Sequence, residues 1–137
     1  MLMVVDGQGG GIGRAIIKRF RDVFKESVEI IALGTNSVAT AQMMKAGANR
    51  GATGENAIVK MVSEVDIIVG PLAIILADSM MGEVTPGISR AISSCRAQKV
   101  LIPLTREKVE IVGVSNEPLP HLIDKAIELI RKGVRDV

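Results

Sequence analysis

The stretch that decides the fold reads Asp6-Gly7-Gln8-Gly9-Gly10-Gly11-Ile12-Gly13-Arg14-Ala15-Ile16. It follows the apolar run Met1–Val5 and opens a segment, ending at Phe24, whose apolar residues recur at helical spacing. This order predicts a buried strand, a tight glycine turn and a helix. Because glycine has no Cβ atom, such a turn leaves the N–H groups at the helix start accessible to a phosphate.

Apolar runs and helical patterns alternate along the rest of the chain. They predict further strands at residues 27–33, 66–69 and 99–104, and further helices at residues 37–45, 55–62, 86–96 and 121–132, the last closed by Gly133. Residues 47–54 fit a glycine-rich passage with a short edge strand, and residues 72–81 fit a strand or a helix equally well. Residues 110–114 predict a strand antiparallel to the one before it.

This alternation indicates one α/β domain over residues 1–137. We expect a three-layer Rossmann-like sandwich whose sheet is mostly parallel and ends in that antiparallel strand. The chain has two Phe and neither Tyr nor Trp, so its core must consist of Ile, Val, Leu, Ala and Met. Such residues suit parallel strands that are buried on both faces.

Charge and cysteine content exclude several classes of protein. The 17 Lys and Arg are spread along a chain of net charge +2, which favours a solvated surface over a nucleic-acid partner. Cys95 is the only cysteine, so an internal disulfide is excluded and a reducing compartment fits. The longest apolar run, residues 67–77, is too short to span a bilayer. We expect a cytoplasmic protein with no membrane partner and no metal.

The spacing of the glycines separates the known phosphate-binding motifs. The pattern G-x-G-x-x-G fails because its third glycine, counted from Gly7, falls on Ile12. The pattern G-x-x-x-G-x-G fits at Gly7, Gly11 and Gly13. It resembles the cofactor-binding turn of short-chain dehydrogenases/reductases, Thr-Gly-x-x-x-Gly-Ile-Gly, with Asp6 in the place of the threonine. A P-loop is not supported, since no Gly-Lys-Ser/Thr follows.

The resemblance implies a dinucleotide, NADP(H) or NAD(H), bound at the turn and at the end of the second strand. The predicted binding residues are Gly7, Gln8, Gly9, Gly10, Gly11, Ile12, Gly13, Arg14, Gly34, Thr35 and Asn36. NAD-binding units place a carboxylate after the second strand, and this chain has none there, which favours NADP. Arg14 and Lys18 are the cations expected near a 2′-phosphate. The alternative interpretation is a turn that only packs helix on strand, with Thr35 and Asn36 as helix caps.

The chemistry of that family does not carry over. Its reaction needs a Tyr-x-x-x-Lys pair, and this chain has no tyrosine. The leading hypothesis is therefore a non-enzymatic or regulatory module that binds a dinucleotide or a related phosphate-bearing ligand at residues 7–13. The alternative is a small enzyme, such as an oxidoreductase without the Tyr-Lys mechanism. Its catalytic residues stay unknown, but its polar candidates, which fit turn and cap residues as well, are Thr53, Glu55, Asp78, Ser79 and Glu83.

Read as a whole, the chain resembles a family of short bacterial proteins classed as a domain of unknown function. The segments that carry the resemblance are residues 7–16, 33–36, 51–57, 77–86 and 99–104. The resemblance implies a compact Rossmann-like fold. Five methionines, at positions 43, 44, 61, 80 and 81, add flexible apolar area that fills a core or is buried in a homodimer.

Overall fold

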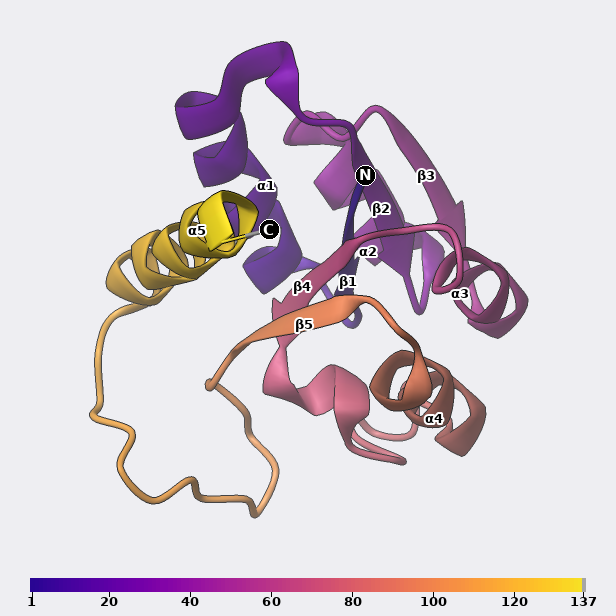
Figure 1. Cartoon of the computed structure of the whole chain (residues 1–137). Coiled ribbons are helices and arrows are strands. Elements are labelled where there is room, and N and C mark those ends of the chain that lie inside the picture. The colour runs from indigo at the N-terminus through magenta and orange to yellow at the C-terminus, as the bar shows by residue number, and fades with distance from the viewer. Residues whose placement is uncertain (137) are drawn as a thin grey trace.

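The computed structural model describes residues 1–136 and is an α/β domain (Figure 1). Its strands are β1 (Leu2–Asp6), β2 (Ile30–Gly34), β3 (Arg50–Thr53), β4 (Ile67–Pro71) and β5 (Gln98–Ile102). Its helices are α1 (Gly11–Phe24), α2 (Ser37–Lys45), α3 (Glu55–Met61), α4 (Pro86–Ser94) and α5 (Leu119–Asp136), with short 3₁₀ helices η1 (Lys25–Ser27) and η2 (Leu72–Ile75).

The strands form one parallel sheet in the order β3-β2-β1-β4-β5. In the centre of the sheet, Val4 of β1 pairs with Ala32 of β2 on one side and Val69 of β4 on the other. The chain builds outward from β1 to β2 and β3, and then returns to the opposite side of β1 for β4 and β5. The strand order therefore reverses between β1 and β4.

Two apolar clusters, one on each face of the sheet, make the three layers of the fold. Leu2 and Val4 point into the cluster that α1, α2 and α5 cover, whereas Met3 and Val5 point into the cluster that α3 and α4 cover. This alternation follows from the two-residue period of a strand. Because β1 is buried on both faces, its sequence is apolar at every position before Asp6.

Two details of the predicted fold are wrong. Residues 110–114 form no strand; they lie in the irregular connection of residues 103–118 between β5 and α5 (Figure 1). Their aliphatic side chains, at positions 111, 112 and 114, are exposed rather than part of a core, and Val112 is fully exposed. The last helix also continues past Gly133 to Asp136. One glycine inside a helix costs only about 1 kcal/mol, and the apolar stripe of α5 is packed against the sheet.

Residues 72–81, which fit a strand or a helix, form η2 and then a series of turns. The strand predicted at residues 27–33 starts only at Ile30, because η1 occupies residues 25–27. The predicted edge strand within the second glycine-rich passage is present as β3.

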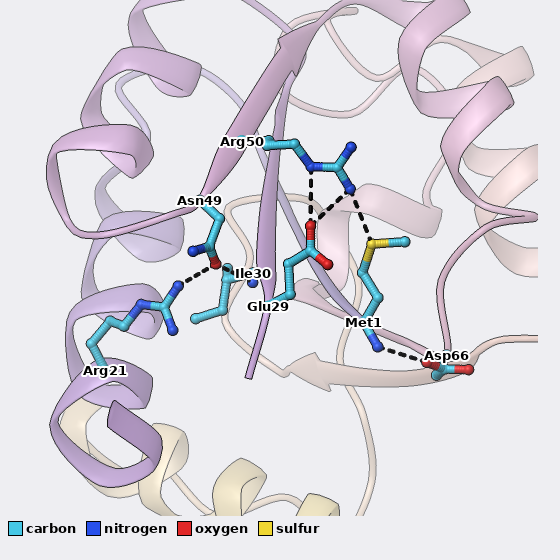
Figure 2. Close-up of polar contacts among 7 residues, drawn as sticks. All are labelled: Met1, Arg21, Glu29, Ile30, Asn49, Arg50 and Asp66. Carbon is cyan, nitrogen blue, oxygen red and sulfur yellow. Dashed lines mark hydrogen bonds and ion pairs between the residues drawn. The ribbon is translucent and has the colours of Figure 1, made fainter. Parts of the chain in front are cut away.

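Polar contacts close the end of the sheet where the strands begin (Figure 2). Asn49 Oδ1 accepts hydrogen bonds from the Ile30 N–H, at 2.8 Å, and from the Arg21 guanidinium. Arg50 pairs with Glu29 at 2.8 Å, and the amino group of Met1 pairs with Asp66 at 2.7 Å. These groups satisfy one another, so this end of the sheet is structural.

Candidate functional site

The candidate site lies at the opposite end, where β1, β4 and β5 terminate beside the reversal of strand order. A cavity of about 630 Å³ opens there. Its lining comes from three connections that are far apart in the sequence, namely residues 6–12, residues 71, 73, 78, 80 and 81, and residues 104–107. Ligands of open α/β sheets bind in this position, outside the carboxyl ends of the strands.

The first of these connections, residues 7–13, is here called the glycine turn. It closes when the Gly10 N–H donates to the Gly7 carbonyl oxygen at 2.9 Å. Gln8 and Gly10 have φ values of 49° and 73°, in the left-handed region that glycine adopts most readily. A Cβ atom on Gly10 would also lie 2.8 Å from the Ala39 Cα atom of α2. The backbone and the neighbouring helix therefore require a glycine at position 10.

The other glycines of the turn divide into two kinds. A Cβ atom on Gly7 would lie 2.6 Å from Met80 Sδ, and one on Gly13 would lie 2.6 Å from Met43 Sδ. At Gly9 and Gly11, by contrast, no described atom lies within 4 Å of that position, apart from the adjacent residues and, for Gly11, the nearby backbone of α1 itself. The fold thus needs glycine at positions 7, 10 and 13 for packing, and leaves Gly9 and Gly11 facing open space.

Two backbone donors of the glycine turn are free. Among the described groups, whose side chains extend to residue 133, the N–H groups of Gly9 and Gly11 have no hydrogen-bond acceptor. Gly11 is the first residue of α1, where the partial positive charge of the helix is concentrated. Both residues line the cavity. The turn can therefore receive an anionic group at its open side.

Asp6, directly before the glycine turn, connects the two ends of the turn. Its carboxylate is buried, and it accepts hydrogen bonds from the N–H of Gly7 at 2.8 Å and of Gly13 at 2.7 Å. Burial raises the pKa of Asp6, although bonds from Gly13, Gly7 and Ile12 oppose that effect. Asp6 thus holds the two ends of the glycine turn together, and leaves the donor of Gly11 unused.

A second carboxylate reaches the turn from the connection after β4. Glu83 Oε1 accepts hydrogen bonds from the Gln8 N–H at 2.8 Å, Thr35 Oγ1 at 2.7 Å and Asn36 Nδ2 at 2.8 Å. Partial burial acts to raise the pKa of Glu83, but these three bonds outweigh it and hold the pKa below its usual value. The sequence offered no sign of this contact, because 47 residues separate Glu83 from Asn36.

The predicted binding residues do not all meet at the cavity. Residues 7–12 line it, whereas Gly13 packs on Met43, and Gly34, Thr35 and Asn36 lie beyond it at the end of β2. Asn36 also caps α2, since its Oδ1 accepts from the Ala39 N–H at 2.9 Å. Arg14 is exposed on α1, where its N–H donates to the Gly10 carbonyl oxygen at 2.9 Å, and its guanidinium has no hydrogen bond or ion pair among the side chains that the structure describes, those of residues 1–133. Ligand contact at these residues stays a prediction.

Residues 76–84 form a loop over the glycine turn with unusual backbone strain. Asp78, Met80 and Met81 have φ values of 65°, 55° and 57°, and all three line the cavity. Non-glycine residues occupy this region at a cost of about 1–3 kcal/mol each, and they concentrate at functional sites. Met81 is 96% exposed, so no packing explains its conformation. The strained residues mark the same cavity as the free amides.

The polar residues suggested for an enzyme are dispersed. Ser79 is buried and donates to the Ala73 carbonyl oxygen at 2.5 Å. Thr53 contacts Thr40 at 2.8 Å, and Glu55 accepts from Thr85, the residue that caps α4. Asp78 is the one of these five candidates that lines the cavity. The five do not assemble into one catalytic group.

Sequence reasoning missed the third wall of the cavity. Leu104, Thr105, Arg106 and Glu107 line it, and Glu107 Oε1 accepts from the Met80 N–H at 2.9 Å. A signal was present, because these residues directly follow the last strand. Polar residues after one parallel strand meet those after the next at the same edge of a sheet. The antiparallel strand predicted nearby obscured this signal.

Comparison with protein families gives a match along nearly the whole chain. Residues 1–135 match the family described as a domain of unknown function, DUF3842. The chain belongs to this family. The same comparisons match no curated protein and no solved structure. Membership of DUF3842 is consistent with the whole-chain resemblance predicted from the sequence, and it assigns no activity.

Among the described residues, no helix of this DUF3842 protein has both the length and the apolar character to cross a membrane.

Proposed function

We propose that the protein binds a dinucleotide of the NAD(H) or NADP(H) class, with the phosphates on the glycine turn. The observation that carries this proposal is the pair Gly9 and Gly11. Neither residue has a Cβ atom, although the fold leaves space for one at both positions. Both residues keep a free N–H group, and both line the cavity. A phosphate needs this combination of close approach and unpaired backbone donors.

The topology supports the same ligand. The order β3-β2-β1-β4-β5 corresponds to the first five strands of the Rossmann sheet, whose dinucleotide lies across the point where the strand order reverses. The cavity lies at that point and, at about 630 Å³, falls within the usual range for small-molecule sites. The glycine turn connects the first strand to the first helix, as it does in dinucleotide-binding units.

We propose further that the protein acts as a binding or regulatory module. The absence of tyrosine removes the reaction of the family that the turn resembles. The dispersal of Thr53, Glu55 and Ser79 offers no alternative catalytic group. One observation favours an enzyme as the second candidate: Asp78, Arg106 and Glu107 line one cavity, where an acid–base pair would face a bound ligand. Turnover of a bound reduced dinucleotide with added carbonyl compounds would support that candidate.

Thermal unfolding with NAD, NADP, ATP and S-adenosylmethionine tests the proposal. A ligand at 100 times its dissociation constant stabilises the native state by about 2.7 kcal/mol, which raises the unfolding midpoint. Because the chain has no Trp and no Tyr, a co-purified nucleotide would also dominate its ultraviolet absorbance.

Two substitutions serve as matched variants. Gly11→Val adds a side chain on the open side of the turn, where no contact of the fold opposes it, and is expected to abolish the shift without loss of folding. Gly133→Ala, within α5 and away from the cavity, is the control that keeps the shift, because a Cβ atom there meets only Gln98 Oε1, at 3.5 Å, among the described atoms outside its own helix. If neither dinucleotide shifts the wild type, or if Gly11→Val binds as well as the wild type, the proposal is wrong.

A further inference from the structure

The end of β2 carries a carboxylate that the local sequence does not supply. Residues 34–37 at this position are Gly, Thr, Asn and Ser, all neutral. Glu83 comes from the loop after β4 and crosses the glycine turn, so its Oε1 atom lies 2.7 Å from Thr35 Oγ1 and 2.8 Å from the Gln8 nitrogen. A negative charge therefore lies between the end of β2 and the glycine turn.

The two oxygens of this carboxylate have different surroundings. Oε1 accepts all three of the bonds from Gln8, Thr35 and Asn36. Oε2 accepts no hydrogen bond from the groups that the structure describes, which are the side chains up to residue 133 and the backbone up to residue 136. One oxygen is thus anchored, while the other keeps its lone pairs available. The lowered pKa of Glu83 keeps the group ionised at neutral pH.

We propose that Glu83 is a specificity-determining residue that selects a dinucleotide with an unphosphorylated adenosine ribose, the NAD(H) class. This inference rests on the proposed function. In Rossmann units an acidic residue at the end of the second strand accepts bonds from the ribose hydroxyls. Here the Oε2 atom of Glu83 takes that role, although Glu83 belongs to another loop. Thr35 and Asn36 hold its carboxylate in position. A 2′-phosphate would meet the same carboxylate and be repelled.

The charges around this position agree with that selection. The carboxyl group of Asp6 also lies at the turn, close enough for the charge of Glu83 to add to the burial that raises the pKa of Asp6. Arg14, the cation that the sequence suggested for a 2′-phosphate, has no contact with Glu83, Thr35 or Asn36 within the described residues. Arg106 lines the cavity from the segment after β5. The inference therefore favours NAD(H), whereas the local sequence at the end of β2 favours NADP, because the fold brings in Glu83 from another loop.

Titration with NADH and NADPH tests the inference, because the two probes differ only in the 2′-phosphate. Their nicotinamide fluorescence is measured directly, since the protein has no Trp or Tyr. We expect the wild type to bind NADH about 10-fold or more tightly than NADPH, as like charges in contact cost several kcal/mol. Glu83→Gln keeps the shape of the side chain and removes its charge. The ratio of the NADPH to the NADH dissociation constant should therefore fall toward one.

Glu26→Gln is the matched control, because it removes the same charge from an exposed position in η1, at the amino end of β2. It should keep the wild-type ratio. Equal or tighter binding of NADPH by the wild type overturns the inference and leaves the proposed function intact. Tighter binding of both probes by Glu83→Gln also overturns it, since Glu83 would then block the site. Binding of neither probe by the wild type overturns the proposed function itself, and this inference with it. If Glu83→Gln folds poorly, the ratio of the NADPH and NADH dissociation constants of the wild type still tests the inference.

Discussion

Individual glycines in the same turn have different roles. Gly10 has a positive φ and contacts α2, whereas Gly9 has neither constraint. We expect Gly10→Ala to lower the free energy of unfolding by about 1–3 kcal/mol, through backbone strain and the contact with Ala39. Gly9→Ala should leave it unchanged or raise it by up to about 1 kcal/mol, because a backbone that alanine tolerates loses less entropy on folding.

Urea unfolding followed by circular dichroism measures both variants, since the chain has no tryptophan to report by fluorescence. Equal losses in the two variants would contradict the assignment of different roles. If Gly9→Ala folds normally and binds the dinucleotide less well, the position serves the ligand alone.

Glu83 gives stability a defined dependence on pH. Its pKa is lower in the folded protein than the ordinary value of 4.5, so the unfolded state binds more protons in this range. The contribution of Glu83 is therefore fully present above pH 4.5 and is lost as the pH falls through the lower folded pKa. The raised pKa of its neighbour Asp6 acts with the opposite sign, since that contribution declines as the pH rises above 3.8.

Comparison of the wild type with Glu83→Gln removes most of the Asp6 effect, because burial is the largest cause of the raised Asp6 pKa and the charge of Glu83 is the smallest. We expect a difference in the free energy of unfolding of about 1–3 kcal/mol at pH 7, from the loss of charged hydrogen bonds. The difference should shrink below pH 4.5. A difference that stays constant from pH 3 to pH 7 would show that the charge of Glu83 does not stabilise the loop.

At the scale of elements, the 103–118 segment is the part of the chain where local pattern and structure disagree. Residues 110–114 are rich in Ile and Val, as strands are. The chain nevertheless runs away from the edge strand β5 after residue 102 and does not pair with it. Strand formation depends on a partner and on a core for one face, and Ile111, Val112 and Val114 have no such core. The glycine turn and α1, in contrast, were predictable because both are decided by neighbouring residues.

This difference predicts where a protease acts first. Arg106 and Lys108 are exposed and lie outside any helix or strand, so trypsin should cut after them before it cuts within α1 or α5. A bound dinucleotide should slow the cut after Arg106, which lines the cavity. Mass spectrometry of timed digests identifies the sites. First cuts within α1 would contradict the prediction, and a variant that carries Arg106→Gln and Lys108→Gln is the control.

At the scale of the whole molecule, stability comes from the two aliphatic layers. Phe20 on α1 is fully buried against the sheet and meets Phe24 edge-on, with ring centroids 5.8 Å apart. We expect Phe20→Ala to lower the free energy of unfolding by about 3–5 kcal/mol, from lost burial and the cavity left behind. Val112→Ala, at a fully exposed position, should change it by less than about 0.5 kcal/mol. Urea titrations of the two variants test this, and a small loss for Phe20→Ala would place that helix outside the core.

The homodimer expected from the sequence stays a prediction at this scale. Met43 is buried within the core of one chain, whereas Met44 and Met81 are exposed. Exposed methionines of this kind are compatible with an interface and do not require one. Light scattering of the protein in solution measures the mass of the particle.

The sequence by itself determined the alternation of strands and helices, the parallel sheet with its aliphatic core, and the glycine turn before α1. These features are local, because they depend on the spacing of apolar residues and on the missing Cβ atoms of neighbouring glycines. Only the tertiary structure decided which of those glycines face the cavity, and that residues 104–107 form its third wall. It also placed the carboxylate of Glu83 at the end of β2, across 48 residues from Thr35. Contacts of this kind depend on the order of strands in the sheet, and no local pattern of residues encodes that order.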